Sequence, residues 1–415
     1  MIRTNQFILF ATTWLLTGLC FAQKTVNITV ENRSGLNREE LAETPVSGIK
    51  DRLNLQGSEA IVVTNAAGEA LPSQITHDGL LLFPVKLQPH ESQTFTLLKG
   101  EAEPTDTLVQ GAFYPERKDD LAWENDRTAY RAYGPALQRS GEKAYGYDVW
   151  TKSVPYPVVR HRYDLTMNPK YGNEVAALKK FDKKAAQKLN SMLSFHIDHG
   201  NGMDRYAVGP TLGCGTNALV DANGAIVYPW AFRTYEILDN GPLRFTVRFE
   251  YTPFDFEGDK NVTEVRTVSL DLGLYLNKTI INYRGLKQNS PIAVGLVIHA
   301  DNPKAYVASA KEGYIGYEDL TERPKEGNGQ IYVGAVMPEK QQKAEAVYFS
   351  PEESKARGNA SGHVLSTGTY KAGKSYTYYW GSGWSKGGMP SLTEWESYLQ
   401  RFALGLKRPL KVSVK

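Results

Sequence analysis

The sequence predicts a mainly β protein, in which an N-terminal β-sandwich is followed by a much larger antiparallel β domain. Three observations support this fold class. Apolar and polar residues alternate in short segments along most of the chain, and Gly, Pro, Asn and Asp separate these segments. Only two stretches show the three- and four-residue spacing of a helix. Phe, Trp and Tyr make up 11% of the residues, and sheet packing accounts for most such rings.

Residues 1–22 are predicted to be a signal peptide that is removed on export. Arg3 precedes a mostly apolar run over residues 7–19, which is too short to span a bilayer. No later stretch approaches the roughly 20 apolar residues of a membrane helix. A lipoprotein anchored through Cys20 is the less favoured alternative, because Leu19 stands where a small residue is expected. We therefore expect a periplasmic protein with no membrane partner.

Composition excludes several classes of protein. Loss of the signal peptide leaves Cys214 as the only cysteine, so no disulfide can form within the exported chain, which must rely on its own core. The chain has 48 Lys and Arg against 45 Asp and Glu, a net charge of +3 that falls to +2 without Arg3. This balance gives no general attraction for nucleic acid, and we expect no such partner.

The N-terminal sandwich is placed at residues 23–103 and the large domain at residues 107–415. Residues 100–106 are polar and contain Pro104, which is typical of a linker. The alternating segments that predict the sandwich are residues 25–30, 60–63, 80–85 and 92–97.

Two arginines mark the beginning of the large domain. If residues 127–132 form a strand, Arg127, Ala129 and Arg131 lie on one face. Two guanidinium groups on one face of a sheet can hold a carboxylate through paired hydrogen bonds. A solvated polar face is the alternative interpretation.

One long helix is expected before the C-terminus, within residues 172–193, and its lysines are expected on the solvated side. Strands dominate after residue 217, and N-cap residues with early acids predict a closing helix over residues 391–402. The apolar stripe that predicts the first helix consists of Leu178, Phe181, Ala185, Leu189 and Met192.

Titratable side chains are densely clustered in residues 194–217, which hold two of the seven histidines. The eleven residues from His196 to Tyr206 include two histidines, two aspartates, an arginine and a tyrosine, and five glycines from Gly200 to Gly215 let the backbone approach a ligand closely. Titratable groups at this density are typical of a cleft. A glycine-rich polar loop with inert histidines is the alternative.

We expect neither a metal nor another cofactor. His196, Asp198 and His199 offer two imidazoles and a carboxylate, but residues three apart on a strand point to opposite faces. The sequence contains no phosphate-binding loop, dinucleotide fingerprint, nucleophile elbow, paired-cysteine motif or zinc-protease motif.

Residues 123–137, 196–217 and 378–384 carry a resemblance to a known family. With these stretches the chain resembles secreted proteins of unknown function from polysaccharide-utilisation gene clusters, and it is similar to an ulvan-oligosaccharide dehydratase. The resemblance covers most of the exported chain. It implies a galactose-mutarotase-like supersandwich and the removal of water from a terminal glucuronate, which leaves a 4,5-unsaturated sugar. A uronate-containing oligosaccharide is therefore the expected partner.

This reaction sets chemical requirements that candidate residues can meet. The C5 proton must be removed, the carboxylate neutralised and the departing C4 oxygen protonated. In D-glucuronate the C5 hydrogen and the C4 hydroxyl lie on the same ring face, so one group or an adjacent pair can serve both proton transfers. The candidate catalytic residues are Tyr206, His196 and His199, and the candidate substrate-binding residues are Arg205, Arg127, Arg131 and Trp384.

Three alternatives remain open from the sequence. A glycoside hydrolase needs two carboxylates about 5 to 9 Å apart, which Asp198, Asp204 and Glu124 can supply. A non-catalytic carbohydrate-binding protein would stack sugars on Trp380 and Trp384. A mutarotase or epimerase is the third, since one fold hosts many activities.

Overall fold

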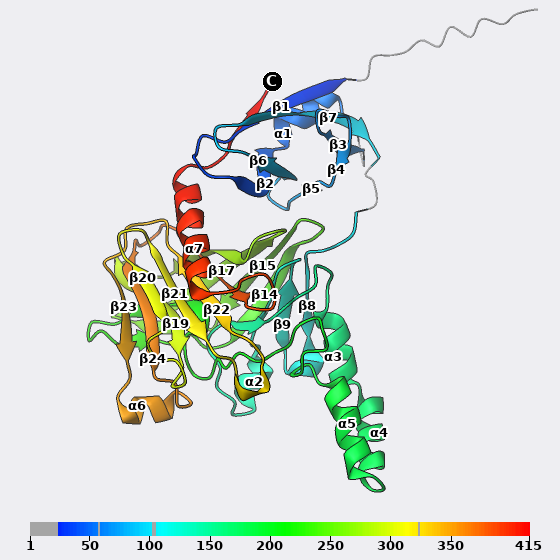
Figure 1. Ribbon diagram of the computed structural model, residues 1–415. Helices are drawn as coiled ribbons and strands as arrows, with labels where there is room; N and C mark the ends of the chain where they lie inside the picture. The colour runs from blue at the N-terminus through cyan, green and yellow to red at the C-terminus, as the bar shows by residue number, and fades with distance from the viewer. Residues whose placement is uncertain (1–23, 57–58, 102–104, 323) are drawn as a thin grey trace, which may run out of the picture.

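The computed structural model describes residues 24–56, 59–101, 105–322 and 324–415 (Figure 1). The protein is mainly β and consists of an N-terminal β-sandwich and a large antiparallel supersandwich, which confirms the predicted fold class. The predicted signal peptide and residues 102–104 of the predicted linker lie outside the described residues. Within the described residues, no helix is long and apolar enough to cross a membrane.

The N-terminal sandwich packs two antiparallel sheets around their apolar faces. Alternation produces this core, because every second residue of a strand such as Val26, Ile28 and Val30 faces inward and is buried. Helix α1, Ser47–Leu53, adds Ile49 and Leu53. One sheet contains, in spatial order, β26 (Lys411–Val414), β1 (Thr25–Glu31), β7 (Ser92–Gly100), β3 (Ala60–Thr64) and β4 (Ala70–Leu71). The other contains β2 (Arg38–Pro45), β6 (Leu80–Leu87) and β5 (Gln74–Ile75).

The last strand of the chain thus belongs to the first sheet. β26 pairs antiparallel with β1, with Ile28 opposite Val414 and Glu31 opposite Lys411. This differs from the predicted division, which assigns all residues after 107 to the large domain. The sequence gives no sign of it because β26 has only four residues and lies beyond the closing helix.

A small four-stranded sheet opens the large domain and carries several polar side chains into its interior. Every residue of β9 and β10 is buried, because both faces of this sheet are covered. Its strands, in spatial order, are β11 (Asp148–Trp150), β10 (Ala129–Ala132), β9 (Asp120–Glu124) and β8 (Gln110–Tyr114), and the short helices η1 (Pro115–Arg117) and α2 (Pro135–Arg139) connect them.

Two larger antiparallel sheets form the supersandwich, and their inner faces share one continuous apolar core. The five-stranded sheet contains β13 (Ile226–Val227), β12 (Cys214–Val220), β19 (Ser290–Ile298), β24 (Gly362–Tyr370) and β23 (Lys343–Tyr348). The nine-stranded sheet contains β14 (Phe232–Asn240), β15 (Arg244–Tyr251), β17 (Asp259–Asp271), β18 (Leu276–Arg284), β25 (Tyr376–Trp384), β22 (Ile331–Val336), β21 (Tyr314–Asp319) and β20 (Tyr306–Ser309), with β16 (Phe254–Phe256) paired to β17. Helices η2 (Pro324–Glu326) and α6 (Pro351–Ala356) lie in connections.

The closing helix is confirmed as α7, Leu392–Lys407. The hydroxyl of Ser391 caps it by accepting a hydrogen bond from the Glu394 N–H (3.2 Å). Trp395 and Leu399 are fully buried against β21 and β22. The Trp395 indole N–H donates to the carbonyl of Val333 (3.0 Å), so the helix is fixed across the sheet.

The predicted single helix is wrong, because the structure forms a helical hairpin instead. Helices α4 (Pro169–Lys179) and α5 (Lys183–Leu193) follow α3 (Val159–Met167). The carboxylate of Asp182 accepts hydrogen bonds from the N–H groups of Lys184 and Ala185 and so begins a new helix. Of the predicted apolar stripe, Phe181 and Met192 are exposed.

Candidate functional site

Residues 194–213 form a loop that connects α5 to β12 and lies against the small sheet. Phe195 anchors it, because its buried ring packs against Trp150 at a centroid distance of 5.0 Å and its N–H donates to the Thr166 hydroxyl (3.2 Å). Gly202 makes the close approach possible, since a Cβ there would lie 1.9 Å from the carbonyl oxygen of Thr151. Its φ of +105° also favours glycine.

The loop brings together the exposed His196 and the buried Asp204 and Arg205. The Nδ1 of His196 lies 2.9 Å from the backbone carbonyl oxygen of Asp204 and 4.0 Å from its carboxylate Oδ2. The Nε of Arg205 donates to the carbonyl of His196 (2.7 Å). The His196 side chain is 46% exposed, whereas that of Arg205 is 7% exposed. The imidazole is therefore the accessible group, and the guanidinium is held at the His196 backbone.

The tautomer of His196 follows from this geometry. A carbonyl oxygen can only accept a hydrogen bond, so Nδ1 must carry a hydrogen to bond to Asp204. The neutral imidazole then has its lone pair on Nε2. His196 in this state offers a base at Nε2 of an exposed ring.

Beneath the loop, three carboxylates surround one buried arginine. Arg131 contacts Asp148, and its guanidinium nitrogens lie 3.1 Å from Asp204 and 3.5 Å from Asp120. All four side chains are at most 5% exposed. This contradicts the predicted role of Arg131, because a guanidinium enclosed by three carboxylates of its own chain does not reach a substrate. It instead holds Asp204, and through the Asp204 backbone it positions His196.

Two of the enclosed carboxyl groups, those of Asp120 and Asp148, have raised pKa values. Burial raises the pKa of Asp120 to about 7, although the nearby Arg131 opposes this shift. Burial also raises the pKa of Asp148, and the hydrogen bond from the Tyr133 hydroxyl (2.9 Å) opposes it. Arg131 thus faces two carboxyl groups, Asp120 and Asp148, that bind their protons more tightly than ordinary aspartates do.

Two further carboxylates lie at the guanidinium of Arg205. Glu322 and Glu326 approach its terminal nitrogens to 3.6 Å and 3.4 Å, and both glutamate side chains are about half exposed. The backbone N–H of Glu322 also donates to the Arg205 carbonyl (3.0 Å). Arg205 is therefore a carboxylate-binding group that its own chain occupies from the solvent side.

Two other predicted site residues have different surroundings. The Nε2 of His199 lies 3.2 Å from the carbonyl oxygen of Ser194, so this exposed ring closes the same turn as His196. Arg127 lies in a turn because its N–H donates to the Asn125 side chain (2.9 Å), and its guanidinium lies over Tyr275 at 5.9 Å. The predicted pairing of Arg127 with Arg131 on one strand face is therefore wrong.

Tyr206 follows Arg205 in the chain but its side chain points into the core. Its ring lies 6.2 Å from that of His299, it is buried, and burial raises the pKa of its phenol well above 10. Its hydroxyl has no hydrogen-bond partner among the described residues. This burial contradicts the predicted role of Tyr206 in proton transfer to a substrate.

We expect Tyr206→Phe to leave turnover unchanged and to leave stability unchanged or raise it by up to about 2 kcal/mol, because a buried hydroxyl without a partner is costly. Chemical unfolding of both proteins measures this. Tyr163→Phe is the matched control, since the Tyr163 hydroxyl donates to Asp120 (3.3 Å) and its loss should cost about 1 to 3 kcal/mol. A loss of turnover in Tyr206→Phe with retained fold would restore Tyr206 to the site.

The predicted stacking of sugars on Trp384 is also wrong. Trp384 is buried, and its indole N–H donates to the carbonyl of Asn328 (2.9 Å). Trp380 is buried as well and stacks on Tyr147 with ring centroids 3.9 Å apart. Both tryptophans are part of the core and leave no free ring face for a ligand.

The carboxylates considered for a hydrolase are all engaged within the protein. Glu124 accepts hydrogen bonds from the N–H groups of Val158 and Val159 and pairs with Lys152 (2.7 Å). Asp198 accepts from two backbone N–H groups of its own turn. Asp204 faces Arg131. This geometry does not favour a pair of carboxylates flanking a glycosidic bond.

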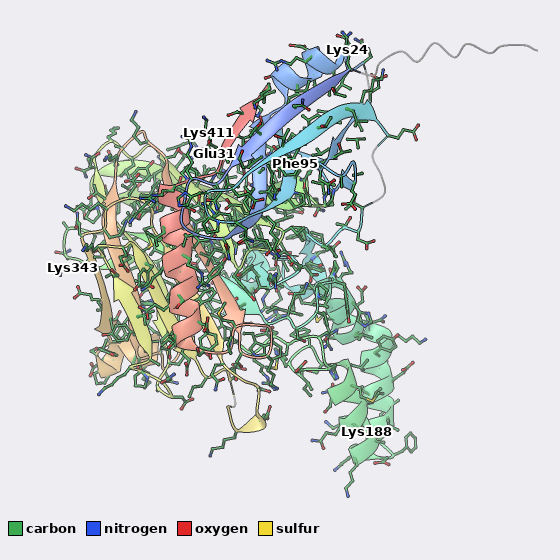
Figure 2. All side chains as sticks on the ribbon, turned by 45° about the horizontal axis from the view of Figure 1, so that its top comes forward. Lys24, Glu31, Phe95, Lys188, Lys343 and Lys411 are labelled. Carbon is green, nitrogen blue, oxygen red and sulfur yellow. The ribbon has the colours of Figure 1, made fainter. Side chains whose placement is uncertain are left out.

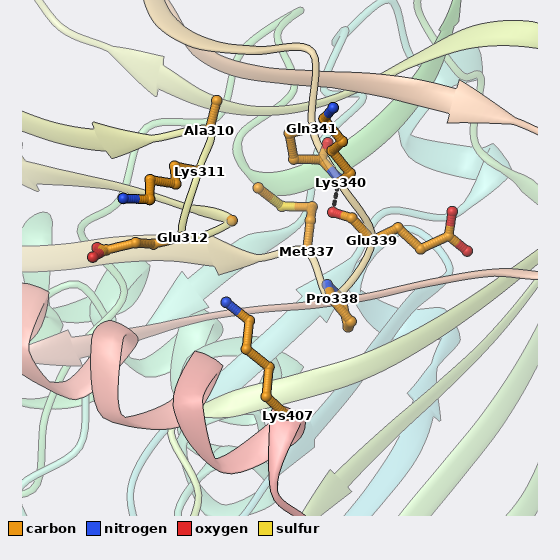
Figure 3. A pocket seen from close by; sticks show the side chains of 10 residues that line it. Ala310, Lys311, Glu312, Met337, Pro338, Glu339, Lys340, Gln341 and Lys407 are labelled. Atoms are coloured by element: carbon orange, nitrogen blue, oxygen red, sulfur yellow. Dashed lines mark hydrogen bonds between the residues drawn. The ribbon is translucent and has the colours of Figure 1, made fainter.

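Among the described residues, no group of three or more His, Cys, Asp or Glu side chains is arranged to hold a metal ion. A cleft of about 460 Å³ lies elsewhere, between the β20–β21 turn, the end of β22 and the last turn of α7 (Figure 3). Its charged groups are three lysines, Lys311, Lys340 and Lys407, and two glutamates. Its lining contains no histidine, tyrosine or cysteine.

Sequence reasoning missed Asp120, Asp148, Glu322 and Glu326. One signal for Asp120 was present, because it lies in the apolar segment Asp120–Glu124 that forms a strand buried on both faces. A charged residue in such a strand is rare unless it is paired. The two glutamates have no comparable signal, since they lie in a polar connection.

Comparison with known proteins identifies the family. An uncharacterised protein P7 from Formosa agariphila is 27% identical over 406 residues, which cover 94% of this chain and 93% of the relative. Two solved structures from Enterococcus faecalis align with 95% of this chain: a protein in glycosyl hydrolase family 38, with a TM-score of 0.48 and 8% identity, and an alpha-mannosidase, with a TM-score of 0.43 and 9% identity. The chain spans about half the length of each, 48% and 46%. The model of the family described as "Domain of unknown function (DUF4861)" matches residues 30–412, and the chain therefore belongs to this family.

Proposed function

We propose that the protein is a carbohydrate-active lyase that eliminates water from a terminal glucuronate of an ulvan-type oligosaccharide. The observation that carries this proposal is the guanidinium of Arg205, which donates to the backbone carbonyl of the accessible His196 and is faced by two glutamates of its own chain. A site that binds carboxylates beside a base has the two groups that elimination from a uronate requires.

In this proposal the substrate carboxylate displaces Glu322 and Glu326 from Arg205. Both glutamate side chains are about half exposed, so they can move into solvent without leaving a buried charge unpaired. The guanidinium would pair the carboxylate in the ground state and more strongly as negative charge develops during removal of the C5 proton.

His196 would transfer the proton. Its Nε2 lone pair takes the C5 hydrogen, and the electron pair of the C5–H bond forms the C4=C5 double bond as the C4–O bond breaks. The imidazolium returns the proton to the departing C4 oxygen, which leaves as water. The two groups lie on one ring face, so a single imidazole suffices, and no oxidant or cofactor is needed. The enzyme would act after export, in the periplasm.

Incubation with a panel of oligosaccharides tests the proposal. Glucuronate-ended oligosaccharides are expected to lose one water by mass spectrometry and to gain the ultraviolet absorbance of an unsaturated uronate. Oligosaccharides that end in a neutral hexose are the control and should remain unchanged. Shorter products with new reducing ends and no such absorbance would instead indicate a hydrolase, and binding without any change in mass would indicate a non-catalytic protein.

A further inference from the structure

The hairpin of α4 and α5, residues 169–193, projects from the body of the protein and is called the lysine arm here (Figure 1). It contains six lysines against only Glu174 and Asp182, a net charge of +4. The whole chain has a net charge of +3, so the remainder is slightly negative. The lysines are Lys170, Lys179, Lys180, Lys183, Lys184 and Lys188.

This positive charge is not neutralised within the protein. All six lysines are exposed, and in the part of the chain that the structure describes none of them forms an ion pair. The carboxylate of Asp182 is already engaged, since it caps α5. Figure 2 shows Lys188 on the arm, far from the sandwich domains. Like charges held together on an exposed element repel one another, and an anionic partner relieves that repulsion.

Packing does not explain the arm. Ala186 is the only residue of α4 and α5 that is fully buried. At the tip, Phe181 is 89% exposed and stands between the lysines of both helices. An exposed ring flanked by cations is suited to a ligand that presents both anionic groups and an apolar ring face.

The arm is continuous with the candidate site. Helix α5 ends at Leu193, three residues before His196, and the Leu193 carbonyl accepts a hydrogen bond from the Thr166 hydroxyl (2.6 Å). The eleven residues of α5 extend over about 16 Å, several times the length of one sugar ring. A chain whose terminal sugar lies at His196 has room to follow the arm outward.

We propose that the lysine arm binds the continuing anionic part of a uronate polysaccharide while its terminal sugar occupies the site at His196 and Arg205. The inference rests on the proposed function for the nature of the polymer. A membrane surface is less favoured, because Phe181 is the one large apolar side chain exposed at the tip, and even a whole acyl chain gives only marginal membrane binding.

The test compares two triple variants by calorimetric binding of polyuronate at low and high salt. The arm variant is Lys180→Gln, Lys184→Gln and Lys188→Gln, and we expect it to lose affinity at low salt by about tenfold or more. It should also show a weaker dependence on salt. The matched control is Lys311→Gln, Lys340→Gln and Lys407→Gln in the cleft of Figure 3, where two glutamates offset the lysines, and it should bind as the unmodified protein does.

Further measurements separate the possible outcomes. Replacing the same three arm lysines by Arg keeps the charge and should retain binding, which would show that loss of fold is not the cause. Equal affinity of the arm variant and the unmodified protein would overturn the inference, as would tighter, arm-dependent binding to phosphatidylglycerol vesicles than to polyuronate. Binding is measured without turnover, so arm-dependent binding without release of water would refute the proposed function alone.

Discussion

Replacing His196 by Asn is expected to lower kcat for water elimination by about 10²- to 10⁴-fold, with little change in KM. The Asn amide can still donate to the Asp204 carbonyl, as Nδ1 of the imidazole does, but it has no basic nitrogen for the C5 proton. The variant therefore removes the base and keeps the turn. Steady-state kinetics with a glucuronate-ended oligosaccharide, together with calorimetric binding of the same ligand, measure both effects.

Three other variants make this result specific. Arg205→Gln should raise KM and lower kcat, because the guanidinium acts in the ground state and more strongly during proton removal. His161→Asn is the control for loss of an exposed histidine, since His161 lies on α3 outside the loop, and it should leave the kinetics unchanged. Normal turnover in His196→Asn combined with inactivity in His199→Asn would transfer the role to His199.

Arg131→Met is expected to lower the free energy of unfolding by about 3 to 5 kcal/mol at pH 8, because it leaves three carboxyl groups buried without their cation. The loss should be smaller at pH 5. Burial raises the pKa of Asp120 to about 7, above the ordinary 3.8, and also raises that of Asp148. Native Asp120 thus binds its proton more tightly than the unfolded chain does, so its contribution to stability falls as pH rises from about 4 to 7.

Without Arg131 these pKa values rise further, and the fall in stability becomes steeper and extends above pH 7. Chemical unfolding at pH 5 and pH 8 measures the difference. Adding Asp148→Asn to Arg131→Met should recover part of the loss, since it removes one of the stranded charges. Arg139→Met is the matched control, because Arg139 is exposed and should change stability by less than about 0.5 kcal/mol. An equal loss at both pH values would contradict this account.

The sequence predicts most of the strands because their side chains alternate with a period of two, and this pattern depends only on neighbouring residues. Residues 194–206 are recognisable for the same reason, since His196, Asp204 and Arg205 meet within one local loop. The break between α4 and α5 could also have been predicted from the sequence. Asp182, two residues before Lys184, is a suitable N-cap for a new helix.

Contacts between distant parts of the chain cannot be predicted from such local patterns. Asp120, Asp148 and Asp204 meet around Arg131 only because β9, β10 and β11 pair with one another and Trp150 pairs with Asp204. Whether the Tyr206 side chain points into the core depends on which side of its loop packs against the core. A loop has no periodic pattern from which this could be predicted. The indole ring of Trp384 is of a type that stacks on sugars, but the surrounding chain buries it.

The pairing of β26 with β1 has a consequence for how the protein is made. The ribosome produces β1 before the large domain and β26 after it, so the first domain cannot complete its sheet until β26 has emerged. Until then the backbone N–H and C=O groups along that edge of β1 lack their partners, and an open edge invites pairing with other chains. The first domain therefore stays incomplete while the whole large domain is being made, and its stability depends on the arrival of a strand from the other end of that domain.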